Sequence, residues 1–108
     1  MITVNSYIDF LTKAVGKDEV VLLLYKSDSD QSLCAYKNLY MASTFQENTH
    51  IFTADVSKVE DIHGIYDMES IPSLLIFSNG KYKNTITGCR DSLYYAALMK
   101  ASDKQPLN

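Results

Sequence analysis

Residues 70 to 81 have the sequence Ser70-Ile71-Pro72-Ser73-Leu74-Leu75-Ile76-Phe77-Ser78-Asn79-Gly80-Lys81. The apolar run from Leu74 to Phe77 predicts a strand that is covered on both faces. Asn79-Gly80 favours the positive φ angles of a two-residue turn, so residues 82–87 are expected to return antiparallel. A proline directly before a buried strand is unusual because it lacks the donor that a strand ladder needs. Pro72 therefore indicates a bend.

The rest of the chain alternates strand and helix patterns around this hairpin. Further strands are expected at residues 2–4, 20–26 and 51–56, and helices at about 5–15, 28–45, 57–66 and 91–101. Asp28 and Gln31 resemble a capping box at the start of the second helix, with Ser29 as an alternative cap. The order β-α-β-α-β-α-β-β-α predicts parallel crossovers in the first half and a hairpin in the second.

Apolar residues spaced by three and four predict which face of each helix is buried. The predicted faces are Ile8, Leu11 and Val15 in the first helix, Tyr36, Leu39, Ala42 and Phe45 in the second, Val59, Ile62 and Ile65 or Tyr66 in the third, and Leu93, Ala96, Ala97 and the Lys100 stem in the last. Residues 1–104 are expected to form one domain, with 105–108 as a loose tail.

Composition limits the classes of function. The 108 residues carry ten basic and thirteen acidic side chains, a net charge of -3, so no nucleic-acid or anionic-membrane surface is indicated. The longest apolar run is far below membrane-spanning length, and no signal peptide is recognised, so we expect a cytoplasmic protein without membrane contact. His50 and His63 lack the cysteine or carboxylate spacing of a zinc site. No metal or cofactor is expected.

The element order and several strings resemble the thioredoxin family over nearly the whole chain. Residues 71–81 resemble the family's cis-proline segment, Thr87-Gly88 resembles the glycine after its hairpin, and residues 21–26 resemble the strand that leads to its redox motif. The resemblance implies an α/β, thioredoxin-like fold in which a mixed sheet of four or five strands is flanked by helices on both faces. It also implies a cis peptide bond before Pro72.

The chain departs from the family at the redox motif. An ungapped alignment places Asp28-Ser29-Asp30-Gln31-Ser32 on the family's W-C-G-P-C, so that serines replace both cysteines. A serine hydroxyl can neither attack a disulfide nor resolve a mixed disulfide. The family's buried carboxylate falls on Leu23 and its lysine partner near Thr53. The degenerate motif Ser29-Asp30-Gln31-Ser32 therefore predicts a redox-inactive binding module.

Two other cysteines leave a different function class open. The alternative is a thiol-disulfide oxidoreductase that acts through Cys34, Cys89 or both. A shifted loop alignment would place Cys34 on the second motif position, but the shift moves Leu39 and Ala42 off the inward face. In the ungapped alignment Cys34 lies about 200° around the helix from Ser32.

In that alignment the two cysteines are interpreted as separate residues. Cys34 is expected to be a small packed side chain, and Cys89 to line a groove without reactivity. A disulfide between them is an alternative that would require Cα atoms roughly 4.4 to 6.8 Å apart.

The resemblance also implies a peptide groove beside the cis-proline, and nothing in its geometry needs a cysteine. Its residues would be Asp28, Ile71, Pro72, Gly88 and Cys89, together with the start of the second helix. We expect this groove to hold an extended polypeptide or protein partner through backbone hydrogen bonds. The acidic rim should favour basic segments.

Overall fold

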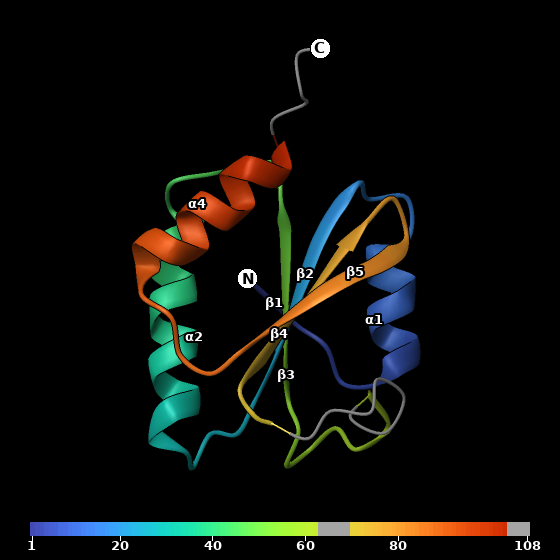
Figure 1. Cartoon of the computed structure of the whole chain (residues 1–108). Helices are drawn as coiled ribbons and strands as arrows, with labels where there is room; N and C mark the ends of the chain where they lie inside the picture. Colours follow the sequence, from blue (N-terminus) through green and yellow to red (C-terminus); the bar gives the residue numbers. More distant parts are fainter. Residues whose placement is uncertain (63–69, 104–108) are drawn as a thin grey trace.

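The structure, a computed structural model, describes residues 1–62 and 70–103 (Figure 1). A mixed sheet of five strands forms its middle layer, in the order β1-β3-β2-β4-β5. The strands are β1 (Ile2–Thr3), β2 (Glu19–Tyr25), β3 (His50–Asp55), β4 (Ser73–Ser78) and β5 (Lys81–Thr87). The described helices include α1 (Tyr7–Ala14), α2 (Asp30–Ser43) and α4 (Ser92–Asp103).

The strand directions confirm the predicted topology. Strand β3 pairs in parallel with β1 and β2, whereas β4 runs antiparallel to β2 and to β5. The Ile71–Pro72 peptide bond is cis, as expected. Asn79 and Gly80 have φ angles of 51° and 81°, which are the two positive values that a tight hairpin turn requires. The hairpin that organises the sequence is therefore present in the fold.

Helices cover both faces of the sheet, which confirms the layered α/β architecture (Figure 1). On one face α1 inserts Phe10, whose ring lies 5.6 Å from that of Phe52 and 5.4 Å from that of Phe77. On the other face α2 and α4 bury Leu39, Tyr95 and Met99 against the sheet. The continuous apolar run of β2 follows from burial on both sides.

The predicted buried face of α1 is wrong by one position. Phe10 is buried, whereas Ile8, Leu11 and Val15 are exposed. Tyr7, Phe10 and Ala14 have the same spacing of three and four, and they pack against the core instead. Periodicity alone cannot separate two adjacent apolar stripes, and the larger area of the phenylalanine ring decides between them.

The prediction for α2 is correct in its middle and wrong at its end. Leu39 and Ala42 are buried and Tyr36 packs against the same cluster. The helix ends at Ser43, however, and Phe45 is exposed beyond it. Ser29, the alternative cap, is the observed N-cap rather than Asp28.

The last helix also turns a different face to the sheet. Leu93 and Ala97 are exposed, whereas Tyr95 and Met99 are buried and Ala96 is partly buried. The two larger side chains at spacing four fill the space over the sheet, so the smaller stripe faces outward. The side chain of Lys100 lies outside the described residues.

The segment after β3 is described only to Ile62. Val59 and Ile62 are buried, as predicted, but the segment is helical only from Asp61 rather than from Ser57. The predicted inward residues Ile65 and Tyr66 lie outside the described residues, as does the predicted tail.

Candidate functional site

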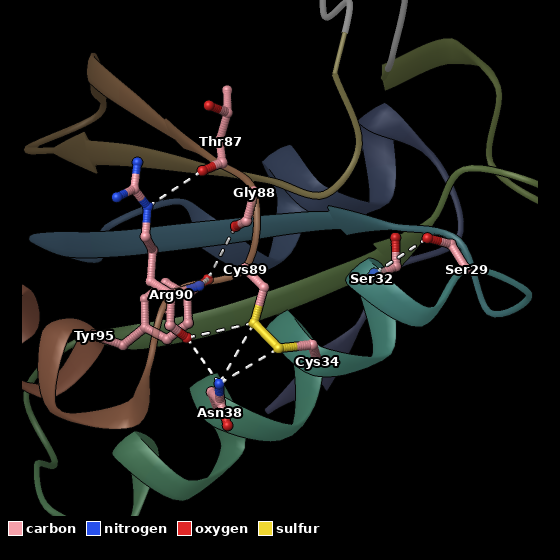
Figure 2. The surroundings of a disulfide bond; sticks show 9 residues. All are labelled: Ser29, Ser32, Cys34, Asn38, Thr87, Gly88, Cys89, Arg90 and Tyr95. Carbon is pink, nitrogen blue, oxygen red and sulfur yellow. Dashed lines mark hydrogen bonds between the residues drawn. A yellow bond between two sulfur atoms is a disulfide. The ribbon is translucent and has the colours of Figure 1, made fainter.

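The two cysteines are joined in a disulfide (Figure 2). Cys34 lies in the second turn of α2, and Cys89 lies in the connection between β5 and α4. Their Cα atoms are 5.8 Å apart, although 55 residues separate them in sequence. The disulfide therefore ties the first helix after β2 to the segment that follows the hairpin.

This bond overturns the expectation of a redox-inactive module with two unconnected cysteines. The prediction that Cys34 and Ser32 lie on different sides of the helix is correct, since Ser32 is fully buried toward the sheet. The expectation failed because the β5–α4 connection runs along the flank of α2 that Cys34 faces. The serines at the helix start thus do not make the site degenerate, since a cysteine pair is present at a different place.

Asn38, which sequence reasoning missed, lies beside both sulfur atoms. Its Nδ2 is 3.7 Å from Cys34 Sγ, 3.5 Å from Cys89 Sγ and 2.9 Å from the carbonyl oxygen of Arg90 (Figure 2). The amide has two hydrogens to share among these three acceptors. The only signal in the sequence is the spacing of four from Cys34, which places both side chains on one helix face.

A buried tyrosine holds the connection that carries Cys89. The phenol oxygen of Tyr95 accepts a hydrogen bond from the Arg90 backbone N–H at 3.2 Å and donates one to the carbonyl of Gly88 at 3.4 Å. Burial raises the pKa of Tyr95, although the Arg90 N–H acts in the opposite direction. The phenol therefore stays protonated at neutral pH and can bond on both sides of Cys89.

Arg90 adds two further contacts to the same connection. Its Nε donates to the carbonyl of Thr87 at 3.3 Å, and its guanidinium lies 5.3 Å from the centre of the Tyr94 ring. These contacts place a positive charge next to Cys89 in sequence and hold its backbone against β5 and α4.

The sheet brings the cis-proline close to Cys89. Gly88 donates its backbone N–H to the carbonyl of Pro72 at 2.9 Å, next to the register pair of Ser73 and Thr87. Gly88 has a φ of 78°, which L side chains rarely adopt. Of the predicted groove residues, the structure thus brings Pro72, Gly88 and Cys89 together.

The other predicted groove residues have different surroundings. Ile71 is partly buried against the core on the α1 face of the sheet. Asp28 is exposed in the connection between β2 and α2.

The residues of the predicted motif serve the start of α2. Ser29 caps the helix by accepting a hydrogen bond from the Ser32 N–H at 3.3 Å. The Ser32 hydroxyl accepts the backbone N–H of Lys26 at 3.0 Å, which ties the helix to the end of β2. Asp30 lies in the first turn, where its charge complements the helix dipole, and Gln31 is exposed.

Residues 1–62 and 70–103 contain neither a cluster of metal-ligating side chains nor a helix that could span a membrane. In this part of the chain no three or more histidine, cysteine, aspartate or glutamate side chains are grouped so that they could hold a metal ion. Among the helices formed by these residues, none combines the length and the apolar character needed to cross a bilayer.

Comparisons with known proteins identify the fold. No family model and no curated protein sequence matches the chain. Among solved structures, a thioredoxin mutant from Halobacterium salinarum has a TM-score of 0.88 at 14% identity, over 98% of this chain and 93% of that one. Malassezia sympodialis thioredoxin has a TM-score of 0.80 at 20% identity, over 93% and 91%.

A third solved structure agrees with these two. Mitochondrial thioredoxin 3 from Saccharomyces cerevisiae has a TM-score of 0.80 at 16% identity, over 95% of this chain and 93% of that one. Similarity at this level of identity establishes architecture and not activity. The chain therefore has the thioredoxin-like fold, with its disulfide between α2 and the β5–α4 connection.

Proposed function

We propose that this protein is a thiol-disulfide oxidoreductase whose redox pair is Cys34 and Cys89. The observation that carries the proposal is the disulfide itself, formed by two partly exposed cysteines with the Asn38 amide beside both sulfurs. Partial exposure gives an attacking thiolate access, and the amide provides a donor for the thiolate that leaves.

The proposed reaction begins from the oxidised protein. A substrate thiolate attacks one sulfur of the pair, the Cys34–Cys89 bond breaks, and the other cysteine leaves as a thiolate within reach of Asn38. The second substrate thiolate then attacks the mixed disulfide and releases the first cysteine. The substrate loses two electrons and becomes a disulfide, while the protein gains two electrons and takes two protons from solvent. The reverse sequence reduces a substrate disulfide.

Asn38 has a specific role in this scheme because the helix start cannot supply the same stabilisation. Cys34 lies four residues beyond Asp30, the first residue of α2. The influence of a helix dipole falls off within the first turn. A hydrogen bond to a charged group is worth more than one to a neutral group, so an amide beside both sulfurs favours the thiolate form of whichever cysteine leaves.

The substrate class that we propose is a polypeptide thiol presented in extended form. Support comes from the position of Cys89 one residue after Gly88, whose backbone is bonded to cis-Pro72. Backbone pairing along this loop would place a substrate cysteine beside Cys89.

A redox titration tests the function directly. The oxidised protein is equilibrated in dithiothreitol buffers of defined potential, quenched with an alkylating reagent and analysed by mass. A reactive pair is expected to titrate above about −300 mV, whereas structural disulfides usually lie below this value. A lower midpoint would contradict the proposal.

A turnover assay is the second test of the proposed oxidoreductase function. Reduction of insulin by dithiothreitol is followed with and without the protein, and the matched control is the Cys34→Ser/Cys89→Ser variant. We expect acceleration by the natural chain alone. Equal rates with the two proteins would reject the oxidoreductase function even if the disulfide were reducible.

A further inference from the structure

A cavity of about 610 Å³ opens between α1 and the tip of the β4–β5 hairpin. Phe10, Val20 and Phe77 line it, and they belong to the core on the α1 face of the sheet. The disulfide lies by α2, which covers the opposite face (Figure 1). The cavity is thus separate from the redox pair, and its volume falls within the range of small-molecule sites.

The local structure explains why this space is both open and preformed. Helix α1 ends at Ala14, and Gly16 reverses the chain with a φ of 79°. Strand β5 is the edge of the sheet, and its first four residues are exposed. The backbone N–H of Asn79 donates to the carbonyl of Asp18 at 2.6 Å, so the hairpin tip is attached to the segment that follows α1.

The lining indicates the kind of ligand that this cavity fits. Phe10 and Phe77 are buried and form the inner wall of the cavity, with ring centres 5.4 Å apart, and the exposed Tyr82 ring lies at its mouth, 5.9 Å from the ring centre of Phe77. Leu11 of α1 and Val15, which directly follows this helix, supply aliphatic contacts. Such a lining favours an apolar, planar ring system, because offset and edge-on ring contacts add to the burial of area.

The charges of the lining argue against an ionic ligand. Lys17 and Asp18 are adjacent in sequence and both line the cavity, so their formal charges cancel. A charged ligand would lose its hydration without a net compensating charge. We propose that the cavity is a binding site for an uncharged aromatic molecule with one polar group directed toward Lys17, Asp18 or Asn79. This site does not depend on the proposed redox function.

A fluorescence titration with N-phenyl-1-naphthylamine, an uncharged aromatic probe, tests this assignment on the full chain. We expect saturable binding with enhanced, blue-shifted emission. Val15→Lys places a charge at the cavity and should weaken binding at least fivefold. Ile8→Lys is the matched control because Ile8 is an apolar residue of α1 with similar exposure, 67% against 76% for Val15, but it does not line the cavity. It should change the affinity less than twofold.

Amide chemical shifts of the natural chain provide a readout that needs no variant. Binding should perturb Gly16, Gly80 and Tyr82, which line the cavity. Absence of saturable binding would overturn the proposal. So would equal weakening by the two lysine substitutions, or shifts confined to α2 and α4, because these results would place the probe elsewhere.

Discussion

The side-chain nitrogen of Asn38 lies 3.5 Å from the sulfur of Cys89, 51 residues away in sequence. The same nitrogen lies 3.7 Å from Cys34, one turn earlier on α2. One amide therefore contacts both ends of the disulfide and also the carbonyl of Arg90. Because either cysteine can leave when the bond is attacked, a donor shared between them can stabilise the leaving thiolate in either case.

Replacement of Asn38 should slow thiol-disulfide exchange. Asn38→Ala removes a hydrogen bond to a developing thiolate, worth about 1.4 kcal/mol, so exchange with dithiothreitol at pH 7 should slow about tenfold. The rate is followed by alkylation and mass analysis. Asn84→Ala, which removes an exposed amide from β5, is the control and should leave the rate unchanged. Equal rates for both variants would exclude a role for the Asn38 amide.

Loss of the disulfide should lower stability. In the chain-entropy model, a cross-link between residues 55 apart contributes about 4 kcal/mol by restricting the unfolded chain. Cys34→Ser and Cys89→Ser should each lower the free energy of unfolding by about that amount in urea titrations without reductant. In excess reductant, the variants and the natural chain should have the same free energy of unfolding, because the cross-link is then absent from all of them. A difference that persists under reduction would show that side-chain packing, not the cross-link, is responsible.

Local signals account for the part of the fold that could be predicted. The cis-Pro72 segment and the Asn79-Gly80 turn act within a few residues, and β2 carries an apolar run that only an interior strand explains. The disulfide could not be predicted in the same way. Its geometry depends on how α4 and the β5–α4 connection pack against α2, which is a contact between distant segments.

The helix faces show a second limit of the sequence. The exposed Ile8 stripe and the buried Phe10 stripe of α1 have the same periodicity, so spacing cannot rank them. The same ambiguity explains why the spacing predicts that Leu93 is buried in α4, whereas Tyr95 is the residue that is buried there. The outcome in both helices depends on which side chain fills the space over the sheet, and that space is defined only after the strands have assembled.

Substitutions in α1 can verify the corrected face. Phe10→Ala removes a buried ring that contacts Phe52 and Phe77, so it should lower the free energy of unfolding by about 3 to 5 kcal/mol. Ile8→Ala removes an exposed side chain and should change it by less than about 0.5 kcal/mol. Chemical denaturation measures both values. If both variants lowered the free energy of unfolding by similar amounts, the face predicted from periodicity would also be buried and the correction would be wrong.

Acid should weaken the fold partly through Asp55. Burial raises the pKa of this carboxyl, but hydrogen bonds from Ser57 and Ser27 and the positive charge of Lys58 together outweigh burial, so the pKa lies below the ordinary value of 3.8. The unfolded chain then binds the proton more readily than the folded one. The contribution of Asp55 is complete above the unfolded pKa and is lost as the pH falls through the folded pKa.

The measurement is the free energy of unfolding between pH 6 and pH 2. Asp55→Asn should show a shallower decline below about pH 4 than the natural chain, because it lacks the group that titrates. Parallel declines for the two proteins would assign the acid sensitivity to other carboxyl groups.

The serines at the start of α2 should matter for stability and not for chemistry. Ser29→Ala removes the side-chain oxygen that accepts the Ser32 N–H, so the free energy of unfolding should fall by about 1 kcal/mol. Ser29→Gly should cost only a few tenths of a kcal/mol, since glycine is tolerated at this cap position. Exchange of the Cys34–Cys89 disulfide with dithiothreitol should proceed at the natural rate in both variants, because Ser29 serves the helix cap. A large fall in the exchange rate with an unchanged free energy of unfolding would show that Ser29 takes part in the redox chemistry. This result would contradict the assignment of Cys34 and Cys89 as the complete redox pair.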